Sequence, residues 1–177
     1  MIVDFFRRDG ILSAVQFMGY PEPQADPPIY DRIRQLPSIG NTLRLADYSN
    51  LALEMAEMTN TRNRRNAYWT LTMEYDILLL RSALDLWVQT TEPHSSRFQT
   101  AFDVNHITPA MRNRASREEG LGDLYGLEGP DIPLTLILLT GTWDKESDDE
   151  EVTGILRGLG NSIEDLARQC GKGCGFK

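Results

Sequence analysis

The sequence predicts an α+β fold, in which an antiparallel or mixed β-sheet of about five strands carries helices packed on one face. Two observations predict it. Five strand-like segments are separated by segments whose apolar residues recur at helical spacing. One strand-like segment, Arg65–Met73, alternates as half-buried antiparallel strands do. A parallel doubly wound sheet is disfavoured because no Gly-rich phosphate-binding turn follows any predicted strand.

The predicted strands are short runs of apolar, β-branched and aromatic residues. They are Ile11–Tyr20, Asn41–Ala46, Arg65–Met73, Phe98–Val104 and Leu134–Trp143. The last run lacks strict alternation, so we expect it to be covered on both faces at the centre of the sheet.

Two long helices are predicted, one over residues 76–88 and one that begins after the acidic run at residues 144–151. A short helix is predicted at residues 29–36. We expect Asp144 or Ser147 to cap the last helix, with the following acids complementing its dipole by about 0.3–1 kcal/mol each. A metal site is disfavoured because the Gly spacing of a calcium loop is missing. Gly154 and Gly158 predict either a close approach to the sheet or a fraying helix.

Composition indicates a folded protein, with 177 residues, 41% hydrophobic and 25% charged. We expect one domain over residues 1–169 and a Gly/Cys tail over 170–177. The net charge is −8, and residues 144–151 supply −5 of it, which argues against nucleic acid or an anionic membrane as a partner. No secretory signal or membrane span is recognisable, so we expect a soluble cytoplasmic protein. Cys170 and Cys174 form half a zinc site at best, and we interpret them as unpaired thiols.

No nucleophile elbow, HExxH or P-loop motif occurs, so the sequence describes no self-sufficient catalytic site. We interpret His94 as a surface-turn residue and His106 as a residue after a strand. A long Gly-rich loop at residues 117–133 is typical of binding segments.

Period-2 geometry gathers polar groups on single faces of two strands. These are Tyr68, Thr70 and Thr72, and Gln99, Ala101 and Asp103. Such groups suit either a small organic ligand or a solvated outer face.

Four segments resemble, in order and spacing, the substrate-binding half of fungal FAD-linked oxidoreductases, the berberine bridge enzyme-like branch of the vanillyl-alcohol oxidase superfamily. They are residues 25–55, 64–87, 98–107 and 126–152. The resemblance covers about Ile11 to Ala167. It implies an antiparallel sheet that roofs the isoalloxazine ring, with hydride transfer from a substrate C–H to flavin N5.

The resemblance also implies site residues. Gln99 in "FQTAF" matches the Gln of a Phe-Gln-Pro type strand that points at the substrate, although Thr100 replaces the Pro. Tyr68 and Thr70 lie on the strand that usually neighbours it, and Asp103 completes the substrate-binding set. The chain lacks the FAD-binding domain, so we do not expect it to hold FAD alone.

Three functions therefore remain open. The first is the substrate-binding lobe of a flavin-dependent oxidoreductase acting on natural-product substrates, redox-inactive without an FAD-binding partner domain. The second is a cofactor-free isomerase or cyclase, in which orientation alone lowers the barrier. The third is a non-catalytic fragment, whose exposed sheet drives self-association as a homodimer or larger species.

Overall fold

The computed structural model describes residues 2–8, 11–58, 61–112 and 131–173. The chain divides into two compact units. The sheet unit comprises Met1–Phe17 and Asn63–Lys177, and the connector unit comprises Met18–Arg62. The prediction of one domain over residues 1–169 stays a prediction.

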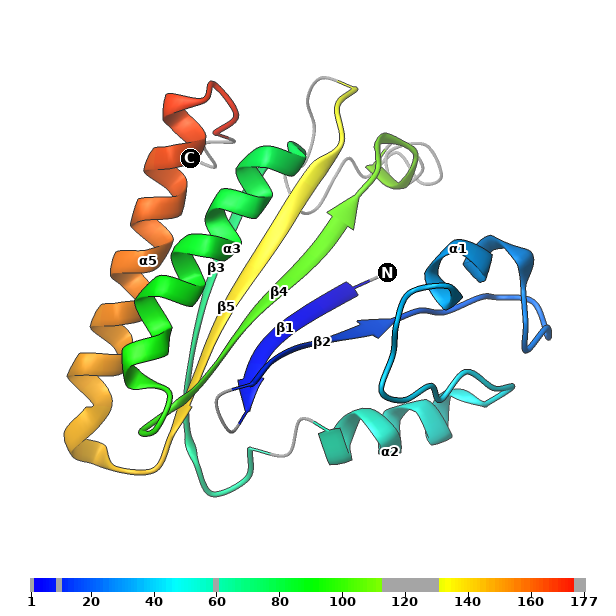
Figure 1. The fold of residues 1–177 in the computed structure, drawn as a ribbon, viewed down its shortest axis with the longest axis horizontal. Helices are drawn as coiled ribbons and strands as arrows, with labels where there is room; N and C mark the ends of the chain where they lie inside the picture. Colours follow the sequence, from blue (N-terminus) through cyan, green and yellow to red (C-terminus); the bar gives the residue numbers. More distant parts are fainter. Residues whose placement is uncertain (1, 9–10, 59–60, 113–130, 174–177) are drawn as a thin grey trace, which may run out of the picture. The chain divides into compact units, whose positions relative to one another are not determined.

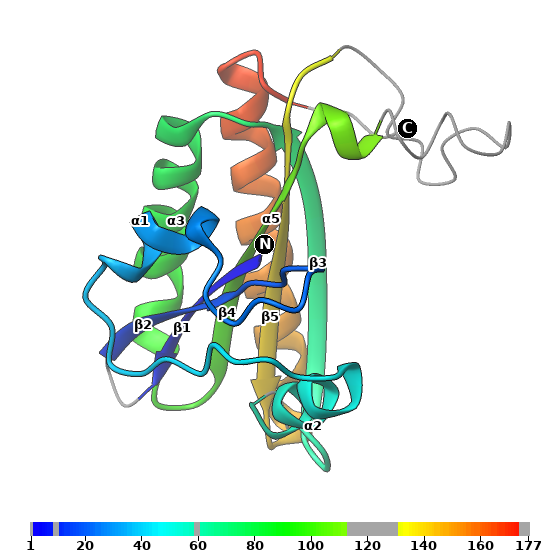
Figure 2. The same ribbon diagram turned by 90° about the vertical axis from the view of Figure 1, so that its right-hand side faces the viewer.

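The sheet unit contains one five-stranded sheet in which every pair of neighbouring strands is antiparallel. The strand order is β2-β1-β4-β5-β3, and Figure 2 shows β4, β5 and β3 side by side. The strands are β1 (Ile2–Arg8), β2 (Ile11–Phe17), β3 (Arg65–Glu74), β4 (Gln99–Ile107) and β5 (Leu134–Trp143). The predicted α+β class with an antiparallel sheet is confirmed.

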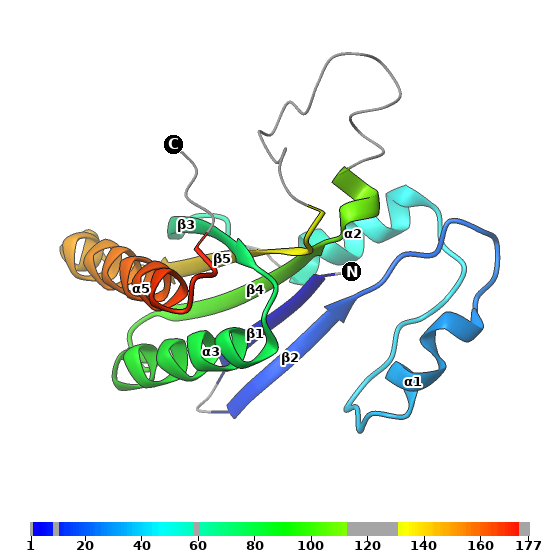
Figure 3. The ribbon, with the colours of Figure 1, turned by 90° about the horizontal axis from the view of Figure 1, so that it is seen from above.

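Two long helices, α3 (Ile77–Thr91) and α5 (Asp149–Gln169), lie next to one another along the sheet (Figure 1). Both are on the same side of it, as the view in Figure 3 shows. The Asp76 side chain caps α3 by accepting hydrogen bonds from the Leu78 and Leu79 amides at 2.9 and 3.0 Å. Short 3-10 turns, η2 (Glu92–His94) and η3 (Glu146–Asp148), lead out of α3 and into α5. The predicted packing of helices on one face is therefore confirmed.

The hydrophobic core lies between this helix pair and the sheet. Its members come from β3, β4, β5 and both helices, and each fully buried side chain contributes roughly 1.5–3 kcal/mol. The most deeply buried are Met73, Ala83, Trp87, Phe102, Ile137, Leu139, Val152, Leu156 and Ile163. Phe5 extends this layer onto β1 through an edge-to-face contact with Phe102.

Strand β5 lies between β4 and β3, which confirms its predicted central place. The expectation that both of its faces are covered is wrong for the middle of the strand, although Leu134 and Thr142 at its ends are buried. Ile137 and Leu139 are buried under the helices, whereas Leu136, Leu138 and Thr140 on the other face are only half-buried. Apolar residues on both faces of a strand therefore do not require two layers of helices from the same unit.

Two strand predictions differ from the structure. Strand β1 was not predicted, although an Asp-Gly pair between two apolar runs is a hairpin signal. Residues 41–46 form no strand. There the Asn41 side chain accepts from the Leu43 amide at 2.9 Å, and Arg44 donates to the Thr42 carbonyl at 3.0 Å, so local bonds replace a sheet ladder.

The connector unit consists of short elements joined by extended chain. These are η1 (Pro28–Tyr30), α1 (Asp31–Arg34) and α2 (Tyr48–Met58). They confirm a short helix near residues 29–36. An ion pair of 2.7 Å between Arg44 and Glu54 joins the extended chain to α2.

The acidic run forms ion pairs with arginines that precede β3 and β4. Arg64 pairs with Asp144 at 2.7 Å, and Arg97 pairs with Asp148 and Glu151 at 2.8 Å. Arg65 donates two hydrogen bonds to Asp149, whose Oδ1 also accepts from Trp143 Nε1 at 2.7 Å. We call this set the arginine clamp.

The clamp corrects the predicted helix cap. The residue before α5 is Asp148, with no side-chain capping bond, and Asp144 and Ser147 do not cap the helix. Asp149, Glu150 and Glu151 do occupy the first turn as expected. The acids therefore hold strand ends together in addition to complementing the helix dipole.

The close approach of α5 to the sheet occurs at Gly160. A Cβ there would lie 2.2 Å from Trp69 Nε1, whereas one at Gly154 or Gly158 would meet nothing within 4 Å. The close-approach explanation of Gly154 and Gly158 is therefore wrong, and Gly160 is the residue that the packing requires.

We predict that Gly160→Ala destabilises the protein by about 1–3 kcal/mol, because the Trp69 ring would have to move. Gly158→Ala in the same helix is the matched control and should raise stability by up to about 1 kcal/mol. Urea unfolding of both variants measures this. Equal effects of the two substitutions would contradict the contact.

We also predict that Asp149→Asn lowers the melting temperature at pH 7 more than Asp165→Asn, which removes an exposed pair with Arg168. The Arg65 hydrogen bonds hold the pKa of Asp149 below its ordinary value. Its contribution is therefore present above the unfolded carboxyl pKa of about 3.9 and lost as pH falls through the folded one. The difference between wild type and Asp149→Asn should vanish near pH 2 in calorimetry.

Candidate functional site

The candidate site is the face of the sheet opposite α3 and α5, which we call the open face. Alternation along each strand and the pairing registers decide its members. Its residues include Asp4, Phe6, Tyr68, Thr70, Thr72, Gln99, Ala101, Asp103, Asn105, Leu136, Leu138 and Thr140. All four predicted site residues, Tyr68, Thr70, Gln99 and Asp103, therefore share one face.

Gln99 lies at the end of the open face nearest the arginine clamp. It pairs with Thr142 on β5, and its Oε1 accepts a hydrogen bond from Arg64 Nη1 at 2.8 Å. Because Arg64 is itself fixed by Asp144, the Gln99 amide is oriented by the clamp. Gln99 is therefore a rim residue rather than a central one.

Tyr68 and Thr70 present their side chains from β3, the strand at one edge of the sheet. Tyr68 is 62% exposed and is paired with Thr140 on the neighbouring strand β5. Thr70 is also exposed and faces Leu138. An aromatic ring and two hydroxyls therefore line this side of the face.

The centre of the open face is a single cross-strand row. The registers align Val15, Asp4, Asp103, Leu138 and Thr70 in this order across all five strands. Thr70 and Asp103 thus flank the same apolar residue, Leu138. Gln99 and Tyr68 belong to neighbouring rows closer to the clamp, so the predicted residues spread over half of the face.

Two carboxyls meet in this row. Asp4 lies directly opposite Asp103, and the side chains are hydrogen-bonded to one another. Burial, then the charge of Asp4 and then this hydrogen bond raise the pKa of Asp103 to about 7. Burial also raises the pKa of Asp4, while the bond from Asp103 opposes that rise. Below about pH 7 the pair therefore keeps one proton, with Asp103 as donor and Asp4 as acceptor.

The oxygen atoms of this pair are not all satisfied. Asp4 Oδ1 is buried and accepts no hydrogen bond from a described residue. A half-buried carboxylic acid beside a carboxylate can donate a proton and accept one at neighbouring positions. Surrounded by Leu138, Ala101 and Phe6, the pair is the most chemically competent group on the face.

Other candidate residues show fewer features of a functional site. His94 forms an ion pair with Glu151 and stacks on Phe98, and His106 lies inside β4 against Tyr75. Cys170 is exposed and free, and Cys174 lies outside the described residues. The described residues contain no group of three metal-ligating side chains. The Gly-rich loop at 117–133 falls mostly outside the described residues.

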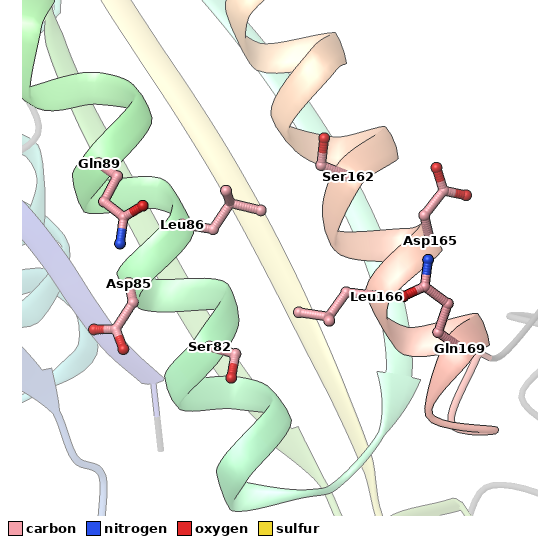
Figure 4. A pocket seen from close by; sticks show the side chains of 8 residues that line it. All are labelled: Ser82, Asp85, Leu86, Gln89, Ser162, Asp165, Leu166 and Gln169. Carbon is pink, nitrogen blue, oxygen red and sulfur yellow. The ribbon is translucent and has the colours of Figure 1, made fainter.

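A groove of about 490 Å³ runs between α3 and α5 on the other side of the sheet (Figure 4). The same four residue types line it from each helix. They are Ser82, Asp85, Leu86 and Gln89, and Ser162, Asp165, Leu166 and Gln169. The leucines point at one another across the groove in Figure 4, whereas Asp85 and Asp165 lie on its outer sides. Its carboxylates do not converge on one point, so the open face is the better candidate.

The sequence did not reveal Asp4 as part of the site. Once residues 2–8 are recognised as a strand, an Asp that alternates with Val3 and Phe5 stands out as a charge at a half-buried position. The missing step was the recognition of β1, whose pairing with β4 brings Asp4 opposite Asp103.

We predict that stability falls as pH rises through neutrality. The folded protein holds a proton on Asp103 that an unfolded carboxyl, with a pKa of about 3.9, releases. This contribution is full below about pH 4 and lost as pH rises through about 7. Urea unfolding between about pH 5 and pH 8 should show the fall, and Asp103→Asn should remove most of it. Asp85→Asn is the control and should keep it; an unchanged fall in Asp103→Asn would refute the assignment.

None of the helices within the described ranges is long and apolar enough to cross a membrane. A scan of family models, a search of curated proteins and a search of solved structures found no match to the chain. Function is therefore inferred from the residues of the open face and from the resemblance of the sequence motifs.

Proposed function

We propose that the chain is the substrate-binding lobe of a flavin-dependent oxidoreductase, whose open face lies over a small organic substrate. One observation carries the proposal: the sheet unit covers one face of its sheet with helices and leaves the other with half-buried apolar residues around a hydrogen-bonded carboxyl pair. This is the arrangement that the motif resemblance implies for a sheet that roofs a flavin.

The mixture of groups supports an organic ligand over a purely solvated face. Leu136 and Leu138 present apolar surface from the central strand, and Thr70 and Thr140 place hydroxyls beside it. Ligand sites combine an apolar lining with a few oriented polar groups. A solvated face would carry charged side chains at the positions that the two leucines occupy.

The open face fits one part of FAD and not another. A flat apolar strip edged by hydroxyls fits the planar isoalloxazine ring, and Leu138, Thr70 and Thr140 would lie against it. The carboxyl pair at the centre would repel a pyrophosphate. Redox chemistry, the acceptance of a hydride from the substrate, would come from the flavin, which a partner domain must hold.

The carboxyl pair favours a second candidate as well. A cofactor-free isomerase or cyclase needs a group that donates a proton and another that accepts one, and Asp103 and Asp4 provide both at one point of the face. In this candidate the lobe itself would act on the ligand, without flavin.

The test is a titration with lumiflavin, which is the ring without ribityl phosphate, followed by NMR of the backbone amides. We predict that amides of β3, β4 and β5 shift and that Leu138→Lys weakens binding at least about tenfold, as the loss of a buried apolar contact implies. Leu78→Lys, at a 73% exposed site on α3, is the matched control and should bind as wild type does.

FAD should bind no more tightly than lumiflavin, because Arg64 at the rim of the face is already paired with Asp144 and the carboxyl pair would repel the pyrophosphate. Shifts confined to α3 and α5, or equal binding by the Leu138→Lys variant, would overturn the proposed site. If lumiflavin does not bind but 2-naphthol shifts the same amides, the flavin-free candidate replaces the first.

A further inference from the structure

We propose that Asp4 is the positioning residue of the site: it shares a single proton with Asp103 and thereby makes Asp103 the acid–base group that faces the ligand. The position of Asp103 on the ligand side rests on the proposed function. The sharing of the proton does not, since it follows from the pairing of β1 with β4.

The geometry comes from the register. Asp4 and Asp103 are directly opposite in an antiparallel pair, where side chains on one face stand about 4.5–5.5 Å apart at Cβ. Two ionised carboxylates directly opposite each other repel, and both are half-buried, where that repulsion is poorly screened. One shared proton turns the repulsion into a hydrogen bond.

No other described group on this face is placed to neutralise the pair. The neighbours in the row are Val15 on β2 and Leu138 on β5, and among the side chains that the structure describes the remaining titratable ones on the face are Tyr68 and Glu74 on β3. Glu74 is paired with Lys172 at 3.1 Å, and Arg64 at the rim is held by Asp144. The shared proton is therefore the main counter-charge that the described residues supply.

This arrangement specifies a class of ligand. The proton of Asp103 is donated to Asp4, so the other oxygen of Asp103 is left to accept, and the site suits a neutral hydroxyl compound such as a phenol or an enol that donates to it. A ligand carboxylate has no proton to donate and would meet the negative charge of Asp4 at close range. In proton exchange, Asp103 would give its proton to an anionic ligand oxygen or, once ionised, take one from a ligand hydroxyl, and Asp4 would keep its charge throughout.

The primary test follows the side-chain carboxyl carbons of ¹³C-labelled aspartates by NMR from pH 3 to pH 9, without ligand. In the wild type one aspartate should titrate near pH 7 and be assigned to Asp103 by its loss in Asp103→Asn. In Asp4→Asn, which keeps the side-chain shape, the Asp103 midpoint should fall by at least about one pH unit, because the neighbouring charge is gone. Asp85→Asn should leave it unchanged.

An Asp103 midpoint near the ordinary value in the wild type, or one that Asp4→Asn does not lower, would overturn the inference. If Asp4→Asn does not fold, the reciprocal measurement decides: in Asp103→Asn, Asp4 should titrate as a single site with no second step above pH 6. A second step there would also overturn it.

A second arm concerns the ligand class and uses 2-naphthol and 2-naphthoate, which share a ring and differ in the acidic group. Naphthol should bind at pH 6 and weaken at least about tenfold in Asp103→Asn, and naphthoate should bind at least about tenfold more weakly than naphthol. Comparable affinities would refute the ligand class. If neither compound binds while the titration holds, the proposed function fails and the proton sharing stands.

Discussion

The helices of the sheet unit cover only one face of its sheet, and this is the constraint on which the rest of the unit depends. The helices α3 and α5 cover one face completely, because Trp87, Phe102 and Ile163 between them and the sheet are fully buried. The opposite face must still present every second residue of each strand. In β5 these residues are Leu136, Leu138 and Thr140, so the central strand is apolar on both sides. Because side chains alternate along each strand, the same strands provide the core on one face and the candidate site on the other.

The arginine clamp keeps this geometry at one end of the sheet. Arg65 begins β3, Trp143 ends β5, and Asp149 begins α5, so the bonds of one carboxylate fix three elements. Arg64 carries the same network onto the open face through Gln99. Exposed ion pairs contribute little singly, but bidentate pairs in a network restrict geometry. The acidic run is therefore best understood as an anchor for strand ends and not as a ligand site.

Much of the sheet could be predicted from sequence, because β3, β4 and both long helices carry clear periodicity and β5 is an apolar run. Period 2 alone placed Tyr68 with Thr70 and Gln99 with Asp103, whereas the registers of β5 with β3 and β4 put the two pairs on the same face. Three features could not be predicted. Strand β1 is fixed by its pairing with β4; the Asn41–Ala46 run has strand-like residues satisfied by local hydrogen bonds; and Gly160 matters only because Trp69 lies beneath it. The first and third depend on contacts between residues distant in sequence, and the second on local hydrogen bonds that replace a sheet ladder.

At position 4, the residue that is present differs from the residues that would stabilise the fold best. An Asn or Thr opposite Asp103 would satisfy a hydrogen bond without a second negative charge, and a Val would match its neighbours Val15 and Leu138. Two carboxyls at a half-buried site instead impose a cost on folding that grows as the proton leaves. Violations of local stability rules concentrate where a protein handles ligands or protons. The register of β1 and β4 places such a violation at the centre of the open face, where the described side chains of the row include no cation. This favours the row over the histidines and the helix groove as the place of the proposed acid–base group.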